Sequence, residues 1–180
     1  MSFRSFFTGD GPGSVTDRPV FFPVGILKLV LLSLCSFGLY QFYWFYKNWQ
    51  YVKEHERAHM RVAWRVLVPY CYCYQLFRRV RDYDHPALEF GSLEAGPLAI
   101  GWILSLFTGL LPYPYALMNY LGFACLVPVQ LRVNQINATV APGHYRNTRF
   151  TMGNWIWLIL GGGVLLLLLI GSFMLIYRER

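Results

Sequence analysis

Two histidines and one glutamate have a spacing that could bind a metal ion. His55 and His59 stand four residues apart, and Glu56 follows the first of them, which matches the pattern His-Glu-X-X-His of zinc peptidases. On a helix, this spacing puts both imidazoles on one face, where they could hold a metal ion while the carboxylate activates a bound water molecule. A third ligand would have to be another acidic side chain, and the candidates are Asp84, Glu89 and Glu94.

A solvated helix beside a membrane explains the same segment with fewer assumptions. Residues 47–61 contain four basic and two acidic side chains, so a match to a pattern with few fixed positions arises easily. No further pair of cysteines or histidines stands at the spacing of zinc ligands. We therefore expect no bound metal, no other cofactor and no catalytic residue, and keep a membrane metallopeptidase as an alternative. The cysteines are interpreted as reduced packing residues: Cys35, Cys71, Cys73 and Cys125.

The composition places this segment in a membrane protein. Of the 180 residues, 56% are hydrophobic and 14% are charged, whereas globular domains carry about 25% charged residues. Residues 95–131 and 150–177 contain no charge, and each run exceeds the roughly 20 residues that cross a bilayer. Residues 21–46 contain only Lys28, whose amine could reach the headgroups from the start of a helix. The sequence therefore predicts an all-α, multi-pass bundle of membrane helices.

Four spans and one shorter segment are predicted within a single membrane domain at residues 21–180, after a flexible tail at residues 1–20. The spans cover residues 24–46, 95–111, 115–131 and 153–177. The apolar run at residues 66–77 follows Arg65, is too short to cross a bilayer and contains Pro69. We therefore interpret residues 62–77 as a re-entrant or interfacial segment. A five-span arrangement in which this run crosses the membrane is the alternative.

Basic residues predict the orientation of these spans. Eleven of the sixteen lie in the two polar stretches, residues 47–84 and 132–149: Lys47, Lys53, Arg57, Arg61, Arg65, Arg78, Arg79, Arg81, Arg132, Arg146 and Arg149. Four lie near the ends of the chain: Arg4, Arg18, Arg178 and Arg180. Because lysine and arginine are enriched on the cytoplasmic side, both polar stretches should be cytoplasmic. Both termini should then be periplasmic.

Small residues recur every fourth position in the predicted span at residues 95–111. Gly101, Ser105 and Gly109 form this stripe, and small side chains at such spacing let membrane helices approach closely. We therefore expect a helix-packing face.

Aromatic residues crowd the end of the first predicted span, where residues 38–49 read GLYQFYWFYKNW. Tyrosine and tryptophan favour the membrane interface, so we interpret the stretch as an interfacial anchor. Its signature residues are Gly38, Tyr40, Tyr43, Trp44 and Asn48. Over residues 22–51, this signature resembles a family of small bacterial membrane proteins of unknown function. The resemblance implies a bacterial inner membrane and no particular activity.

These features favour a non-enzymatic scaffold, assembly factor or envelope factor in the inner membrane. Its expected partners are the bilayer and anionic phospholipids, with other membrane proteins or a second copy as further candidates; no motif indicates nucleic acid. The residues expected to bind acidic headgroups are Lys53, Arg57, Arg61, Arg78, Arg79, Arg81 and Arg132. A small channel or transporter component is another alternative, with polar pathway residues Ser33, Ser36, Gln41, Ser105, Thr108, Asn119 and Gln130.

Overall fold

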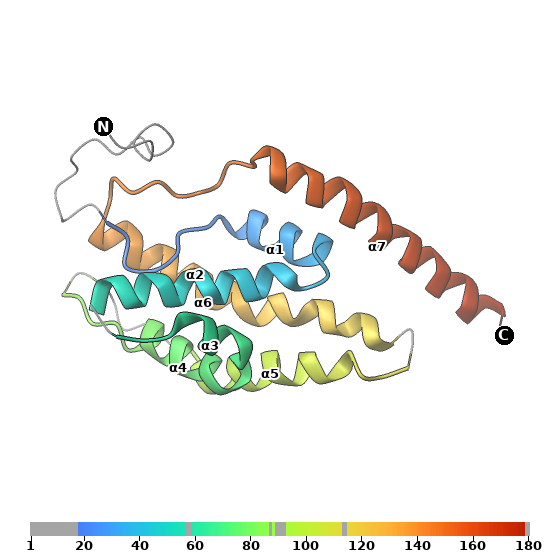
Figure 1. Ribbon diagram of the computed structural model, residues 1–180, viewed down its shortest axis with the longest axis horizontal. Coiled ribbons are helices and arrows are strands. Elements are labelled where there is room, and N and C mark those ends of the chain that lie inside the picture. The colour runs from blue at the N-terminus through green and yellow to red at the C-terminus, as the bar shows by residue number, and fades with distance from the viewer. Residues whose placement is uncertain (1–17, 57–58, 87, 89–92, 113–114, 179–180) are drawn as a thin grey trace.

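The computed structural model of the protein describes residues 18–56, 59–86, 88, 93–112 and 115–178, and it contains helices but no strand within these residues (Figure 1). In chain order the elements are α1 (Ile26–Cys35), α2 (Leu39–Glu56), α3 (Val62–Leu67), α4 (Pro69–Arg81), α5 (Ala95–Thr108), the 3-10 helix η3 (Tyr115–Gly122), α6 (Phe123–Val140) and α7 (Met152–Arg178). The all-α prediction is confirmed for the described residues.

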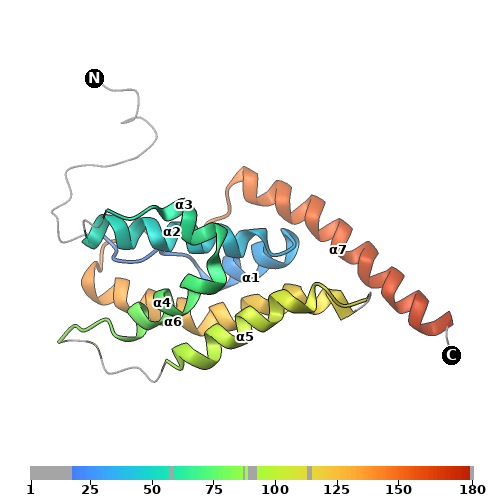
Figure 2. The same ribbon diagram turned by 60° about the horizontal axis from the view of Figure 1, so that its bottom comes forward.

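The expected span at residues 24–46 is a helical hairpin, not one helix. α1 and α2 lie side by side and are joined by a tight turn (Figures 1 and 2). In this turn, Phe37 and Gly38 have φ angles of 54° and 85°, and such left-handed residues end a right-handed helix. The backbone N–H of Gly38 donates to the carbonyl of Ser33 at 2.9 Å, which closes the end of α1. Hydrophobicity continues through the turn and conceals it in the sequence.

Polar loops gather at one end of the bundle, which we call the polar end. α2, α4 and α6 all finish there, beside the extended residues 18–25 (Figures 1 and 2). The opposite, apolar end carries the α1–α2 turn and the residues that follow α5, where Leu110 is 82% exposed. Because residues 18–25 lie with the basic loops, the structure does not support the expected placement of Arg18 on the opposite side of the membrane.

Aromatic side chains fill the core between α2, α4 and α5. Phe45 stacks on Phe77 with ring centroids 6.0 Å apart, and its ring lies 4.7 Å from that of Trp102. These three side chains are fully buried. The core thus joins the first half of the chain to α5.

Among the described residues, two helical stretches are long and apolar enough to cross a membrane. They are Tyr115–Val140, which combines η3 with α6, and Met152–Leu175 in α7; α1 and α5 are shorter apolar helices. The four-span bundle is therefore not confirmed. Residues 62–77 form α3 and the first part of α4, and α4 packs against α5.

Glycines mark two close helix contacts. A Cβ atom at Gly161 of α7 would lie on the carbonyl group of Cys35 at the end of α1, so these backbones touch there. The stripe on α5 faces η3 and α6: a Cβ at Gly101 would lie 3.0 Å from the Cys125 sulfur, and one at Gly109 would lie 3.3 Å from the Asn119 amide. The stripe's third member, Ser105, lies against Gly122 of η3 in the same contact.

Candidate functional site

The His-Glu-X-X-His segment does not have the geometry of a metallopeptidase site. α2 ends at Glu56, so His55 and His59 do not share a helix face, and each lines a different groove. The Glu56 carboxylate forms an ion pair with the Arg79 guanidinium. Among the described residues, no three histidine, cysteine, aspartate or glutamate side chains are placed to hold a metal ion. The helical spacing that motivated the metal hypothesis is therefore absent from the structure.

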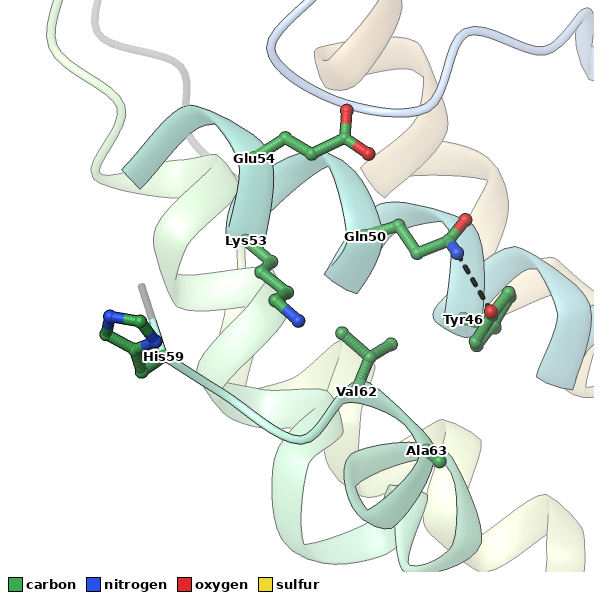
Figure 3. A pocket seen from close by; sticks show the side chains of 7 residues that line it. All are labelled: Tyr46, Gln50, Lys53, Glu54, His59, Val62 and Ala63. Atoms are coloured by element: carbon green, nitrogen blue, oxygen red, sulfur yellow. Dashed lines mark hydrogen bonds between the residues drawn. The ribbon is translucent and has the colours of Figure 1, made fainter. Parts of the chain in front are cut away.

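Two open grooves flank the end of α2. The smaller, of about 500 Å³, lies between α2 and residues 59–63, and Lys53 extends across it towards Val62 (Figure 3). The Gln50 amide donates to the Tyr46 hydroxyl along one side at 2.8 Å. The larger groove, of about 670 Å³, is lined mainly by polar side chains: His55, Glu56, Gln75, Arg78, Arg79, Asp82, Tyr83 and Asp84, with Val20, Phe21 and Val52 beneath. Both grooves belong to the polar end.

Arginines of α4 are partly neutralised by acidic neighbours. Arg78 and Arg81 both pair with Asp82, at 3.2 and 2.7 Å. The hydrogen bond from Arg81, with that from Arg78, lowers the pKa of the Asp82 carboxyl below its usual value. Since Arg79 pairs with Glu56, none of these three expected headgroup ligands is free of an acidic neighbour.

The other expected headgroup ligands fall into three groups. Lys53 and Arg61 are exposed, as that role requires. Arg132 is only 8% exposed, and its Nε has no hydrogen-bond partner, so its side chain does not present a surface charge. Arg57 lies outside the described residues.

Four amide side chains bind the extended residues 18–25 at the polar end. The Asn137 Oδ1 accepts from the N–H groups of Val20 and Phe21 at 3.0 and 3.1 Å, and its Nδ2 donates to the carbonyl of Phe21 at 2.8 Å. The Asn48 Oδ1 accepts from the N–H of Phe22 at 3.2 Å. These backbone groups are buried, and each bond satisfies one that has no partner within a helix.

Gln130 and Asn134 complete this set, which we call the amide clamp: Asn48, Gln130, Asn134 and Asn137. The Gln130 Nε2 donates to the carbonyl of Val24 at 3.3 Å, and the Asn134 Nδ2 donates to the same carbonyl at 3.1 Å. The Gln130 Oε1 accepts from the Trp44 indole N–H at 2.6 Å. Three members lie on one face of α6, at positions 130, 134 and 137. The sequence predicted a span that ends at residue 131 and a polar stretch at residues 132–149, so it divided this helix between the two. The helical spacing of the three members was the signal that could have found them.

The aromatic signature is mostly internal. Trp44 and Asn48 are fully buried, so they are core and clamp residues, not members of an interfacial belt. Gly38 forms the hairpin turn. Tyr40 is half-buried and Tyr43 is 45% exposed, with their ring centroids 5.5 Å apart. Tyr43 alone retains the exposure that the anchor interpretation requires.

Lys28 is held by the protein and does not extend to a membrane surface. It is 5% exposed, and its Nζ donates to the Asn147 Oδ1 and to the carbonyl of Arg149, both at 2.8 Å. These acceptors precede α7, so the contact ties the start of α7 to α1. Two of the polar residues considered for a transport pathway are also hydrogen-bonded within the protein: Gln41 accepts from the Trp102 indole N–H at 2.7 Å, and Gln130 accepts from that of Trp44. The buried Ser33 hydroxyl has no partner among the described residues.

A cationic cluster surrounds Trp49 of α2, which is fully buried. The Arg65 guanidinium carbon lies 4.3 Å from the centre of the Trp49 ring and 5.2 Å from that of Tyr72. The Arg79 guanidinium carbon lies 5.8 Å from the same tryptophan. α2, α3 and α4 each contribute to this cluster. Its members are separated along the chain, so no local sequence pattern reveals it.

Comparison of the chain with protein-family models, with curated proteins and with solved structures gives no match. The resemblance of the aromatic signature to small bacterial membrane proteins therefore stays a prediction.

Proposed function

We propose that this chain is an integral membrane protein that acts as a scaffold or assembly factor and not as an enzyme. The observation that carries the membrane location is the exposure of α7: only 11% of the residues in its most apolar stretch are buried. A soluble core helix would be covered by protein, whereas this surface requires lipid or another apolar partner. The resemblance of the aromatic signature favours a bacterial cytoplasmic membrane.

The proposed arrangement has three crossings, made by α5 together with residues 109–112 that follow it, by η3 with the apolar part of α6, and by α7. α1 and α2 form a re-entrant hairpin. The 10 residues of α1 rise about 15 Å, roughly half of the bilayer's hydrocarbon thickness. The contact between Gly161 and Cys35 agrees with that depth, because it lies nine residues after Met152, about a third of the way along α7.

This arrangement puts the polar end on the cytoplasmic side and the end of α7 on the periplasmic side. Arg18 then joins the eleven basic residues already expected there, which strengthens the positive-inside bias. The scaffold role is supported by the use of the buried polar groups: the amide clamp and Lys28 bind the chain's own backbone and loops. The ion pair of Glu56 with Arg79 likewise gives no support to a catalytic base at Glu56.

Cysteine labelling tests this arrangement. In a variant without the four native cysteines, single cysteines replace Arg18, Tyr145 or Tyr177, and spheroplasts are treated with a membrane-impermeant maleimide. We expect Tyr177→Cys to react in intact spheroplasts, and the other two variants to react only after lysis. Reaction of Arg18→Cys before lysis would refute the re-entrant hairpin and restore a single first span.

A further inference from the structure

The Trp49 cluster contains two buried hydrogen-bond donors without an acceptor. The Trp49 Nε1 and the Arg65 Nη1 are both inaccessible to solvent, and neither has a partner. The guanidinium carbon lies 4.3 Å from the Trp49 ring centre, so both donors belong to one small region between α2 and α3. Buried donors are nearly always paired in proteins. Two unpartnered donors in one small region are consistent with an acceptor supplied from outside the chain.

The charges of the cluster specify an anionic acceptor. Arg65 and Arg79 both lie against the Trp49 ring, where two like charges repel each other. The only acidic side chain in ion-pair contact with this cluster, among the described residues, is Glu56, and it pairs with Arg79. Arg65 has no ion pair with any described residue. An anion near Arg65 would supply the missing charge and the missing acceptor together.

The neighbouring surface favours an anion that carries an apolar chain. α3 and the start of α4 expose Trp64, Leu67 and Tyr70, at 58%, 70% and 52%. Aromatic side chains of this kind favour the zone where acyl chains meet headgroups. The planar guanidinium matches the oxygen spacing of a phosphate better than an ammonium does. The cluster and its rim thus combine a phosphate ligand with a lipid-facing surface.

We propose that Trp49, Arg65 and Arg79 form a binding site for a phosphate group, and that its occupant is the phosphate of an acidic lipid headgroup. The lipid source rests on the proposed membrane location. The phosphate chemistry rests only on the cluster. The occupant accepts from the Trp49 indole N–H and pairs with Arg65, while Glu56 competes with it for Arg79.

Isothermal titration of the purified protein in a neutral maltoside detergent tests the site. Short-chain phosphatidylglycerol is titrated in one series and inorganic phosphate in another. The variants are Arg65→Gln, Trp49→Phe and Glu56→Gln. The matched control is Arg146→Gln, which removes the same charge from an exposed position outside the cluster and outside the expected headgroup ligands. Thermal unfolding of each variant checks that it is folded.

For the lipid, we expect Arg65→Gln to raise the Kd by about tenfold or more, since a hydrogen bond to a charged group is lost. Trp49→Phe keeps an aromatic ring but loses the N–H, and should raise the Kd by about three- to tenfold. Arg146→Gln should change it by less than about twofold. Glu56→Gln should lower the Kd by up to about fivefold, because it frees Arg79 from an exposed ion pair.

The Glu56→Gln result separates a ligand site from a purely structural stack, which would gain no affinity from that change. If Arg65→Gln does not fold, Trp49→Phe and Glu56→Gln decide the question. Equal losses in Arg65→Gln and Arg146→Gln, or unchanged lipid affinity in Trp49→Phe and Glu56→Gln, would overturn the site. Binding of inorganic phosphate with no binding of lipid would overturn the lipid occupant. The cysteine-labelling experiment does not depend on the phosphate site, so a result that overturns the site leaves the proposed topology unchanged.

Discussion

Asn137 offers a direct test of whether the amide clamp holds residues 18–25 in place. Replacing it with leucine keeps a side chain of similar size but removes one acceptor and one donor. The N–H groups of Val20 and Phe21 and the carbonyl of Phe21 then lose their partners. Asn137, Val20 and Phe21 are each at least 97% buried, so water cannot replace these bonds without local opening.

The expected cost follows from the number of bonds lost. Each buried group left without a partner costs about 1–3 kcal/mol, and three such groups give at least about 3 kcal/mol before relaxation. Typical domains are stable by about 5–15 kcal/mol, so the variant should unfold far more easily. Gln135→Leu is the matched control, because Gln135 is an exposed amide on the same helix and its change should stay within about 0.5 kcal/mol.

Equilibrium unfolding in mixed micelles with increasing sodium dodecyl sulfate measures the difference. Hydrogen exchange of the peptide at residues 18–25 adds a local measurement, since its amides should lose protection in Asn137→Leu and keep it in Gln135→Leu. If the two variants unfold within 0.5 kcal/mol of each other and exchange alike, the clamp does not stabilise the fold, and our reasoning about it is wrong.

Two further predictions concern glycine and cysteine positions. Gly161→Ala should lower the stability of the protein sharply and separate α7 from α1, because the added Cβ would overlap the Cys35 carbonyl. Gly163→Ala is the control, because its Cβ would meet open space. Equal unfolding midpoints for the two variants would contradict the close contact. A soluble maleimide at neutral pH should label the exposed Cys71 and spare Cys73. Cys73 is fully buried, and that burial raises the pKa of its thiol to about 11. Label on Cys73 of the folded protein, detected by mass spectrometry, would contradict this prediction.

Local sequence patterns were sufficient to predict the all-helical class and part of the helix packing. The uncharged run at residues 95–131 predicted two consecutive helical segments, residues 95–111 and 115–131, and α5 and η3 do pack against each other. The spacing of Gly101, Ser105 and Gly109 predicted one packing face, and the structure sets all three against η3 and α6. Such features depend on residues close in sequence, so a single chain can reveal them.

Long-range contacts could not be predicted in this way. The Asn137 amide binds a backbone segment 116 and 117 residues earlier, and the Trp49 cluster joins three helices. The histidine pattern gave the opposite error, because it assumed that α2 continues to His59, whereas the helix ends at Glu56. An argument from helical spacing holds only if all of the residues concerned lie in the same helix.

The aromatic stretch after Gly38 illustrates why hydropathy misjudges a short hairpin. A span and a buried hairpin both need apolar side chains, so composition does not distinguish a tryptophan at a membrane interface from one in a protein core. The deciding feature is the reversal of the chain at Gly38, because it directs α2 back along α1 into the bundle and not out of the bilayer. Once the chain turns there, Trp44 must pack inside and its N–H must find a buried acceptor, which Gln130 supplies. Asn48, one turn further, meets residues 18–25 for the same reason. The aromatic signature is therefore better explained by a helical hairpin that packs against the preceding residues 18–25 than by a membrane anchor.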